Sequence, residues 1–262
     1  MFEKRKAIVL VILLLLAGQI SSQTYEIGLQ GGISAYKGDL NRDKLFNKVY
    51  GSGGIMIRYN HNKHVSVSLN NYYTLLKGND MGRNQPFVIM PAGSPNELPE
   101  KQYAFETQLV ELSLQAEINF LPFVSGNVET RYTTYLFGGL GGIYFNPTGY
   151  KNAHTQNRQE IINNAHWYNG VKPDDFSNFS IISLLGFGFK VNVVQNFIAG
   201  IEWGFRYAGL PGNNNAGTDY LDMVSLKGNP KNNDWYSIMA INFTYKFLDR
   251  SRPECPIHHN LQ

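Results

Sequence analysis

Residues 109–120 read Leu-Val-Glu-Leu-Ser-Leu-Gln-Ala-Glu-Ile-Asn-Phe, and this stretch decides the fold class. Apolar and polar residues alternate strictly along it, as in Val110-Glu111-Leu112. A period of two places one set of side chains on each face of an extended chain, which predicts a β-strand with one apolar and one polar face. The apolar face carries Val110, Leu112, Leu114, Ala116, Ile118 and Phe120.

Seven further segments alternate in the same way, which predicts an all-β chain with eight strands. The fifth is ambiguous because Gly138, Gly139, Gly141 and Gly142 blur its two faces, and these glycines are typical of curvature in a small closed barrel. The other predicted strands lie near residues 25–35, 55–60, 65–75, 132–146, 179–193, 197–207 and 235–247.

The links between these strands alternate in length. Long links fall near residues 37–52, 78–103, 147–177 and 208–233, and short links at 60–63, 121–131 and 194–196. Long loops on one side and tight turns on the other are typical of bacterial outer-membrane barrels, which have even strand numbers. We therefore predict an eight-stranded antiparallel transmembrane β-barrel of the outer-membrane type, with long extracellular loops and short periplasmic turns.

Aromatic residues are predicted to form two belts at the membrane interfaces. The predicted periplasmic belt contains Tyr25, Tyr59, Phe120, Phe123, Tyr132, Phe197, Tyr245 and Phe247, and the predicted outer belt contains Tyr36, Tyr73, Phe105, Tyr144, Phe179, Tyr207 and Trp235. Alternation alone does not separate this barrel from a soluble lipocalin-type barrel, which buries its apolar face inward. The belts, the one-sided long loops and the N-terminus favour the membrane barrel.

The N-terminus has the order of a secretory signal peptide. A basic start (Met1 to Lys6) is followed by an apolar run (Ala7 to Ala17) and then by small residues up to Ser22. The run is too short for a membrane-spanning helix, and no later segment approaches about 20 apolar residues. We predict a signal peptide over residues 1–22, a barrel over 23–248, a periplasmic tail over 249–262 and a location in the outer membrane.

If the apolar face meets lipid, the polar face lines the interior. An eight-stranded barrel is filled by its own side chains, and buried charges need partners, so we expect a paired polar network and no pore. The charged residues on this face are four acids and four bases: Glu26, Arg58, Glu111, Glu117, Lys190, Glu202, Arg206 and Lys246.

Several function classes have no support in the sequence. Without the leader, 20 bases face 19 acids, because Lys4, Arg5, Lys6 and Glu3 leave the totals of 23 and 20, and this balance argues against a nucleic-acid partner. No metal-binding histidine motif, serine-hydrolase elbow or nucleotide fingerprint is present, so we expect no enzyme, cofactor or metal site. The single cysteine, Cys255, lies in the tail between Pro253 and Pro256, and in an oxidising compartment it predicts a free thiol or an intermolecular disulfide with a partner.

Four stretches resemble the PorG-type barrels of the type IX secretion and gliding motility machinery. They are Gly38-Asp39-Leu40-Asn41 after the first strand, residues 109–120, the passage Tyr135 to Gly141 with Phe145-Asn146-Pro147, and residues 218–225. Met223 stands where the family pattern leads us to expect an acidic residue, and the chain after Phe247 matches least.

This resemblance implies an outer-membrane barrel that anchors or positions a periplasmic ring of a PorK/GldK-type lipoprotein and a PorN/GldN-type protein. The family carries no catalytic residues to transfer. We expect the turn from Leu121 to Arg131, including Phe123, and the tail with Pro253, Cys255 and Pro256 to dock this ring. Two alternatives stay open: an enzyme acting through outer-loop residues such as His166, Asp219 and Asp222, and an adhesin using the long loops.

Overall fold

The structure of the protein is a computed structural model that describes residues 24–37, 49–79, 103–127, 129–151, 159–161, 177–210, 221 and 234–249. The predicted signal peptide and the tail beyond Asp249 lie outside the described residues. Among the described residues, no helix has the length and apolar character needed to cross a membrane.

Eight strands of 11 to 20 residues form the body of the molecule. They are β1 (Thr24–Lys37), β2 (Val49–Asn60), β3 (Val65–Asn79), β4 (Tyr103–Asn119), β5 (Tyr132–Lys151), β7 (Phe179–Val194), β8 (Phe197–Tyr207) and β9 (Trp235–Asp249). Each is long enough to cross a bilayer, which takes about 9 to 11 tilted residues.

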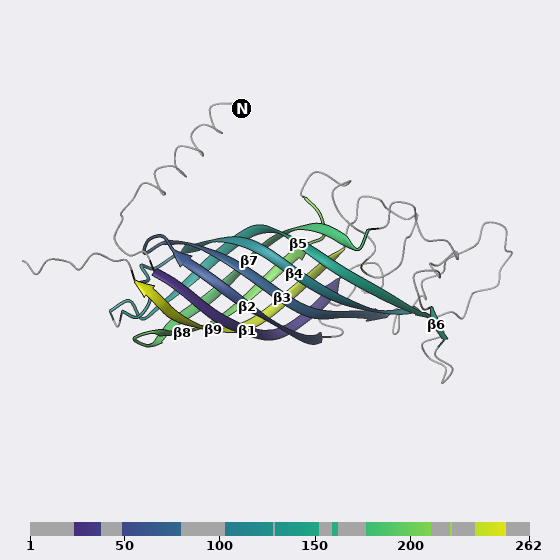
Figure 1. The fold of residues 1–262 in the computed structure, drawn as a ribbon, viewed down its shortest axis with the longest axis horizontal. Coiled ribbons are helices and arrows are strands. Elements are labelled where there is room, and N and C mark those ends of the chain that lie inside the picture. Colours follow the sequence, from purple (N-terminus) through teal and green to yellow (C-terminus); the bar gives the residue numbers. More distant parts are fainter. Residues whose placement is uncertain are drawn as a thin grey trace, which may run out of the picture.

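These strands close into a barrel (Figure 1). Every neighbouring pair is antiparallel, the first and last strands pair from Thr24↔Asp249 to Lys37↔Trp235, and β4 pairs β5 to complete the ring. The short strand β6 (Gln159–Ile161), which the sequence pattern does not predict, adds to the end of β5 outside the ring. The eight-stranded antiparallel barrel predicted from the sequence is therefore confirmed.

The two ends of the barrel differ in their connections. At one end, named here the turn end, short links over residues 61–64, 120–131 and 195–196 join the strands, and β1 begins and β9 ends there. At the other end, named the loop end, the strands lead into the long links. The fifth strand continues to Lys151, five residues beyond the predicted Asn146, because it pairs with β4 over that whole length.

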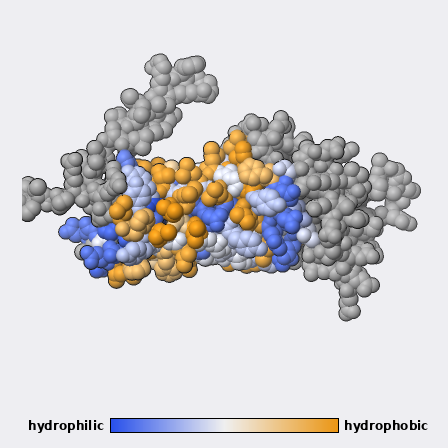
Figure 2. Space-filling view, in the orientation of Figure 1, coloured by the Kyte–Doolittle hydropathy of each residue, from blue (hydrophilic) through white to orange (hydrophobic). Residues whose placement is uncertain are grey.

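Large hydrophobic side chains are exposed on the outer surface of the barrel, and on the face shown in Figure 2 they gather over its middle, with hydrophilic residues mainly at the two ends. Side chains such as Leu29, Leu185 and Phe243 are 68%, 66% and 63% exposed, which is the opposite of a soluble barrel. Aromatic pairs flank this band: Tyr25 and Tyr59 have ring centroids 4.9 Å apart near the turn end, and Tyr207 and Trp235 are 4.9 Å apart near the loop end. An apolar wall around a charged interior is the arrangement of outer-membrane barrels.

Three residues assigned to the aromatic belts from the sequence point inward instead. Tyr36 and Phe105 are 1% and 2% exposed, and their rings form an edge-on pair inside the loop end. Phe123 is 2% exposed inside the turn end. Phe123 belongs to a turn and not to a strand, so alternation does not assign it to a face. At the loop end the interior itself is apolar, and aromatic character therefore does not distinguish the two faces there.

Two glycines of β7 create space for two large rings of β5. A side-chain carbon at Gly188 would lie 2.4 Å from the ring of Tyr135, and one at Gly186 would lie 2.4 Å from the ring of Phe137. Because Tyr135 pairs with Gly188 and Phe137 pairs with Gly186, these small positions let the two rings lie over β7. This packing fixes the faces of β5, which the sequence pattern leaves ambiguous.

Candidate functional site

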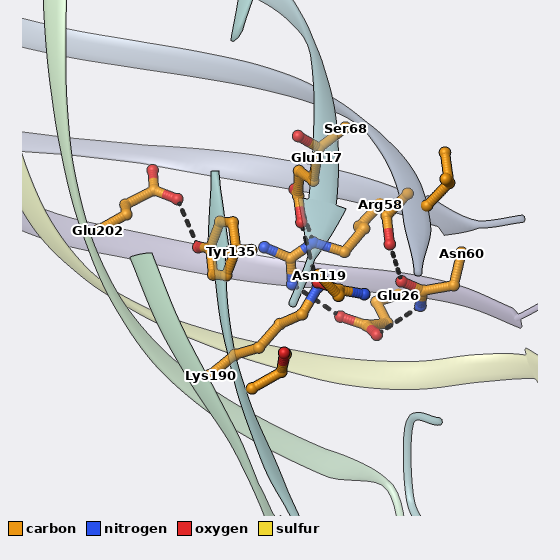
Figure 3. A network of polar contacts seen from close by, with 12 residues as sticks. Glu26, Arg58, Asn60, Ser68, Glu117, Asn119, Tyr135, Lys190 and Glu202 are labelled. Atoms are coloured by element: carbon orange, nitrogen blue, oxygen red, sulfur yellow. Dashed lines mark hydrogen bonds and ion pairs between the residues drawn. The ribbon is translucent and has the colours of Figure 1, made fainter. Parts of the chain in front are cut away.

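The interior next to the turn end contains four buried charged side chains, named here the ionic cluster: Glu26, Arg58, Glu117 and Lys190. Arg58 on β2 lies between two carboxylates, with its Nη1 3.0 Å from Glu26 Oε2 and its Nε 2.9 Å from Glu117 Oε1 (Figure 3). Lys190 on β7 donates from Nζ to the other oxygen of Glu117 at 3.1 Å. The cluster therefore joins β1, β2, β4 and β7 across the lumen.

Neutral groups satisfy the remaining carboxylate oxygens of the ionic cluster. Glu26 accepts hydrogen bonds from Asn60 Nδ2 at 2.7 Å, from the Thr244 hydroxyl at 2.8 Å and from the Ser125 hydroxyl. Lys190 Nζ also lies 4.8 Å from the ring centroid of Tyr135. Buried charges are tolerated only when they are paired and hydrogen-bonded. Every charge of the ionic cluster is ion-paired, and among the described residues Arg58 Nη2 is the one cluster nitrogen buried without a hydrogen-bond partner.

A second polar group, named the central cluster, occupies the middle of the lumen and comprises Glu111, Arg206, Tyr236, Tyr72, Tyr135 and Glu202. Arg206 donates from Nε to Glu111 Oε2 at 3.2 Å, and the Tyr236 hydroxyl donates to the same oxygen at 2.7 Å. Glu202 instead has two tyrosine partners, with its Oε1 2.9 Å from the Tyr72 oxygen and its Oε2 3.1 Å from the Tyr135 oxygen.

The turn of residues 120–131 folds across the turn end of the lumen. Asn192 on β7 holds it: the amide Nδ2 lies 2.9–3.0 Å from the carbonyl oxygens of Val124, Asn127 and Thr130, and Oδ1 accepts from Gly126 N at 2.9 Å. Gly126 has a φ of 81°, in the left-handed region that favours glycine, and a side-chain carbon there would collide with the carbonyl of Gln195. The turn is therefore fixed in place by β7 and by the β7–β8 connection.

The interior at the loop end is apolar, which differs from the polar interior expected from the sequence. The residues there, named the apolar cluster, are Leu76, Phe105, Leu109, Ile143, Phe145 and Ile182. Leu221, from the last long link, is fully buried with them. Its backbone N donates to Asp234 Oδ2 at 3.0 Å, its carbonyl accepts from the Thr107 hydroxyl at 2.5 Å, and the Tyr36 hydroxyl donates to Asp234 Oδ1 at 2.5 Å.

The structure places seven of the eight predicted interior charges inside the barrel, all of them buried. Lys246 is half-buried at the turn end, with its Nζ close to Gly126. Among the predicted docking residues, Arg131 is exposed, whereas Phe123 faces the lumen with Lys190 Nζ 5.2 Å from its ring centroid. Pro253, Cys255 and Pro256 lie outside the described residues.

Sequence reasoning missed the tyrosines of the central cluster. Tyr72 and Tyr236 occupy inward positions next to outward-facing Tyr73 and Trp235. The strict alternation of inward and outward side chains along each strand is the signal that identifies them. Asp234 and Leu221 carried no such signal because neither lies in a strand. In the described part of the chain, no group of three or more His, Cys, Asp or Glu side chains is arranged to hold a metal ion.

Comparison with known proteins gives distant structural likenesses. Neisserial surface protein A is 12% identical, with a TM-score of 0.45, covering 85% of this chain and 97% of that chain. OprG from Pseudomonas aeruginosa is 9% identical, with a TM-score of 0.41, covering 87% and 98%. Ail from Yersinia pestis, solved with the heparin analogue sucrose octasulfate, is 11% identical, with a TM-score of 0.38, covering 87% and 100%.

The strand pairings of this chain by themselves close the barrel. A search of curated proteins gave no match. A family model described as a domain of unknown function (DUF6089) matches residues 5–255, which is nearly the whole sequence, and the chain therefore belongs to the DUF6089 family.

Proposed function

We propose that this protein is an integral outer-membrane barrel of the type IX secretion system that anchors or positions a periplasmic ring. The ring consists of a PorK/GldK-type lipoprotein and a PorN/GldN-type protein, as the resemblance of residues 109–120 and 218–225 to PorG-type barrels implies. In this proposal a signal peptide over residues 1–22 directs export, the turn end faces the periplasm and the loop end faces outward.

The observation that carries the proposal is the fixed turn at the turn end. Three carbonyls and one amide of residues 124–130 bond to the single side chain of Asn192, so the turn does not need to be ordered by a partner. A preformed surface loses little conformational entropy on binding. Leu121, Pro122 and Arg131 are exposed on this turn, and β9 delivers the tail at the same end.

Phe123 is not part of the proposed docking surface, because its ring is buried under Lys190. The proposed docking surface consists of Arg131 and the tail residues Pro253, Cys255 and Pro256. Cys255 is proposed to form a disulfide with a periplasmic partner, since a lone thiol in an oxidising compartment is available for intermolecular pairing. A reducible higher-mass band on non-reducing gels supports this, and identical migration of Cys255→Ser and the wild type contradicts it.

The test of the docking role is affinity purification from gently solubilised envelopes with identification of the bound proteins by mass spectrometry. We expect ring proteins at fixed stoichiometry with the wild type, and their loss when residues 250–262 are deleted or Arg131 is changed to Glu. Lys37→Glu, an exposed position at the loop end, is the matched control and retains the partners. A wild-type barrel that purifies without periplasmic partners overturns the proposal.

The protein is also proposed to form no pore of its own. The ionic cluster and the turn of residues 120–131 fill the turn end of the lumen, and the apolar cluster fills the loop end. Planar-bilayer recordings are expected to show no stable conductance. Solute-selective channels formed by the purified wild-type barrel contradict this part of the proposal.

A further inference from the structure

The buried charges on the strands do not balance if every carboxyl group is ionised. The strands bury four glutamates, Glu26, Glu111, Glu117 and Glu202, against three cations, Arg58, Lys190 and Arg206. Three of the glutamates form ion pairs with these cations. Glu202 is 4% exposed and, among the described residues, has hydrogen-bond partners but no ion pair. An unpaired buried carboxylate is costly, and such a group commonly becomes neutral instead.

The hydrogen bonds around Glu202 also indicate a neutral carboxyl group. The Tyr72 oxygen lies 2.9 Å from Glu202 Oε1 and is also bonded to Gln30 Oε1. A tyrosine hydroxyl has one hydrogen and donates to one acceptor only. Because Gln30 Oε1 accepts that hydrogen, the contact between Tyr72 and Glu202 requires a hydrogen supplied by Glu202.

The orientation of the Gln30 amide is set by its other contacts. Its Nε2 lies 3.0 Å from Asn70 Oδ1 and 3.3 Å from the carbonyl oxygen of Ile55. Turning the Gln30 amide over brings two oxygens together at Ile55, even if Asn70 turns as well to follow it. The orientation in which Gln30 donates to Ile55 and accepts from Tyr72 is therefore favoured, because amide orientation follows the hydrogen-bond network.

We propose that Glu202 is a proton-binding site in the barrel interior, where it is a neutral carboxylic acid that donates from Oε1 to Tyr72 and accepts at Oε2 from Tyr135. A protonated carboxyl group has one donor and one acceptor, which matches the two tyrosine contacts (Figure 3 shows Tyr135 and Glu202). With Glu202 neutral, three buried anions on the strands face three buried cations. The further buried carboxylate, Asp234, lies at the loop end, where the Tyr36 hydroxyl and the Leu221 amide donate to it.

The groups that surround Glu202 come from several strands. Arg206 lies over the ring of Tyr72 at 5.5 Å, and Arg58 lies over the ring of Tyr135 at 5.9 Å. Among the described residues, the ion pairs of both arginines are with glutamates other than Glu202. Each of these arginines already has a carboxylate partner. The charged and titratable neighbours are Tyr72 on β3, Tyr135 on β5, Arg58 on β2, Arg206 on β8 and Glu117 on β4. Glu111 on β4 is bonded to Arg206 and to Tyr236 on β9.

Infrared spectroscopy of the folded barrel tests the proposal directly. The wild type is expected to show the C=O stretch of a protonated carboxylic acid at neutral pH, and the Glu202→Gln variant is expected to lose it. Glu106→Gln is the matched control, because Glu106 is paired with Lys77 outside the lumen and its removal leaves the band in place. A wild-type spectrum without the band, or a band that survives in Glu202→Gln, overturns the proposal.

Equilibrium unfolding supplies a second readout. An unfolded glutamate is ionised well above its ordinary pKa of about 4.3, so folding of the wild type takes up one proton near neutral pH. Between about pH 6 and pH 8, the ratio of the wild-type folding equilibrium constant to that of Glu202→Gln is then expected to fall by about tenfold per pH unit. Glu202→Gln, which is neutral and of the same shape, is expected to fold. Parallel pH profiles, or a Glu202→Gln barrel as destabilised as Glu117→Gln, overturn the proposal.

Discussion

The turn-end and loop-end halves of the lumen are filled by different chemistry. Near the turn end, Arg58 is bonded to Glu26 and Glu117, whereas near the loop end Phe105 packs edge-on against Tyr36. An ionic filling depends on every partner, because removing one leaves an uncompensated charge. An apolar filling depends on volume and shape, and the loss of one side chain leaves a cavity whose lining relaxes only in part. The same strands are therefore sensitive to the loss of a charge partner near the turn end and to the loss of side-chain volume near the loop end.

The largest effect is expected from Arg58→Met. This variant leaves Glu26 and Glu117 buried without their shared cation, and breaking such a pair costs about 3–5 kcal/mol in free energy of unfolding. The measurement is urea unfolding in detergent or vesicles, with the folded fraction read from heat-modifiable migration. Lys77→Met is the control, because the Lys77–Glu106 pair is 28% exposed on both sides and such pairs contribute at most about 1 kcal/mol. Equal losses in the two variants contradict the role assigned to the ionic cluster.

Leu109→Ala tests the apolar half, with an expected loss of about 2–5 kcal/mol because the side chain is fully buried. Adding Glu117→Gln to Arg58→Met should recover part of the stability lost in the ionic half, whereas no second substitution that removes a charge should rescue Leu109→Ala. The same unfolding assay measures both variants. Leu112→Ala, at an outward position 53% exposed, is the control and should lose less. A rescue of Leu109→Ala by Glu117→Gln contradicts the division of the lumen into two halves.

Asn192→Ala should release the turn of residues 120–131, at a cost of about 1–3 kcal/mol for the carbonyls and the amide left without their partner. Hydrogen exchange measures the effect, and we expect faster exchange confined to this turn. Gln195→Ala, an exposed position on the neighbouring connection, should leave the turn protected. Unchanged exchange in Asn192→Ala indicates that Ser125 and Phe123 hold the turn without it.

The smallest effect is expected from Thr107→Val, which keeps the side-chain shape and removes the hydroxyl bonded to the Leu221 carbonyl. One such hydrogen bond contributes about 1 kcal/mol. Unfolding measurements give the change, and Thr134→Val, at an exposed outward position, should have a smaller one. A loss as large as that of Leu109→Ala shows that burial of Leu221 holds much of the apolar half together.

The alternation of side chains between the two faces of each strand predicts a large part of the candidate site. Glu26, Arg58, Glu111, Glu117, Lys190, Glu202 and Arg206 are each on the polar face of a clearly alternating segment, and the structure buries all seven. Lys246 is on the same face of β9 as the buried Asn242 and Thr244, but it is only half-buried because it lies near the end of the strand, where the barrel opens. Alternation does not assign Phe123 and Leu221 to a face, because turns and loops have no period of two.

The sequence by itself determined the all-β class and the eight strands, because local alternation and the lengths of the links are properties of the chain alone. Only the tertiary structure decided which charges meet. Arg58 and Glu117 are 59 residues apart, and Glu26 and Thr244 are 218 apart, so the closure and stagger of the barrel set their contacts. The apolar filling of the loop end was likewise decided in three dimensions, where Tyr36, Phe105 and Leu221 come together from distant strands and a long link.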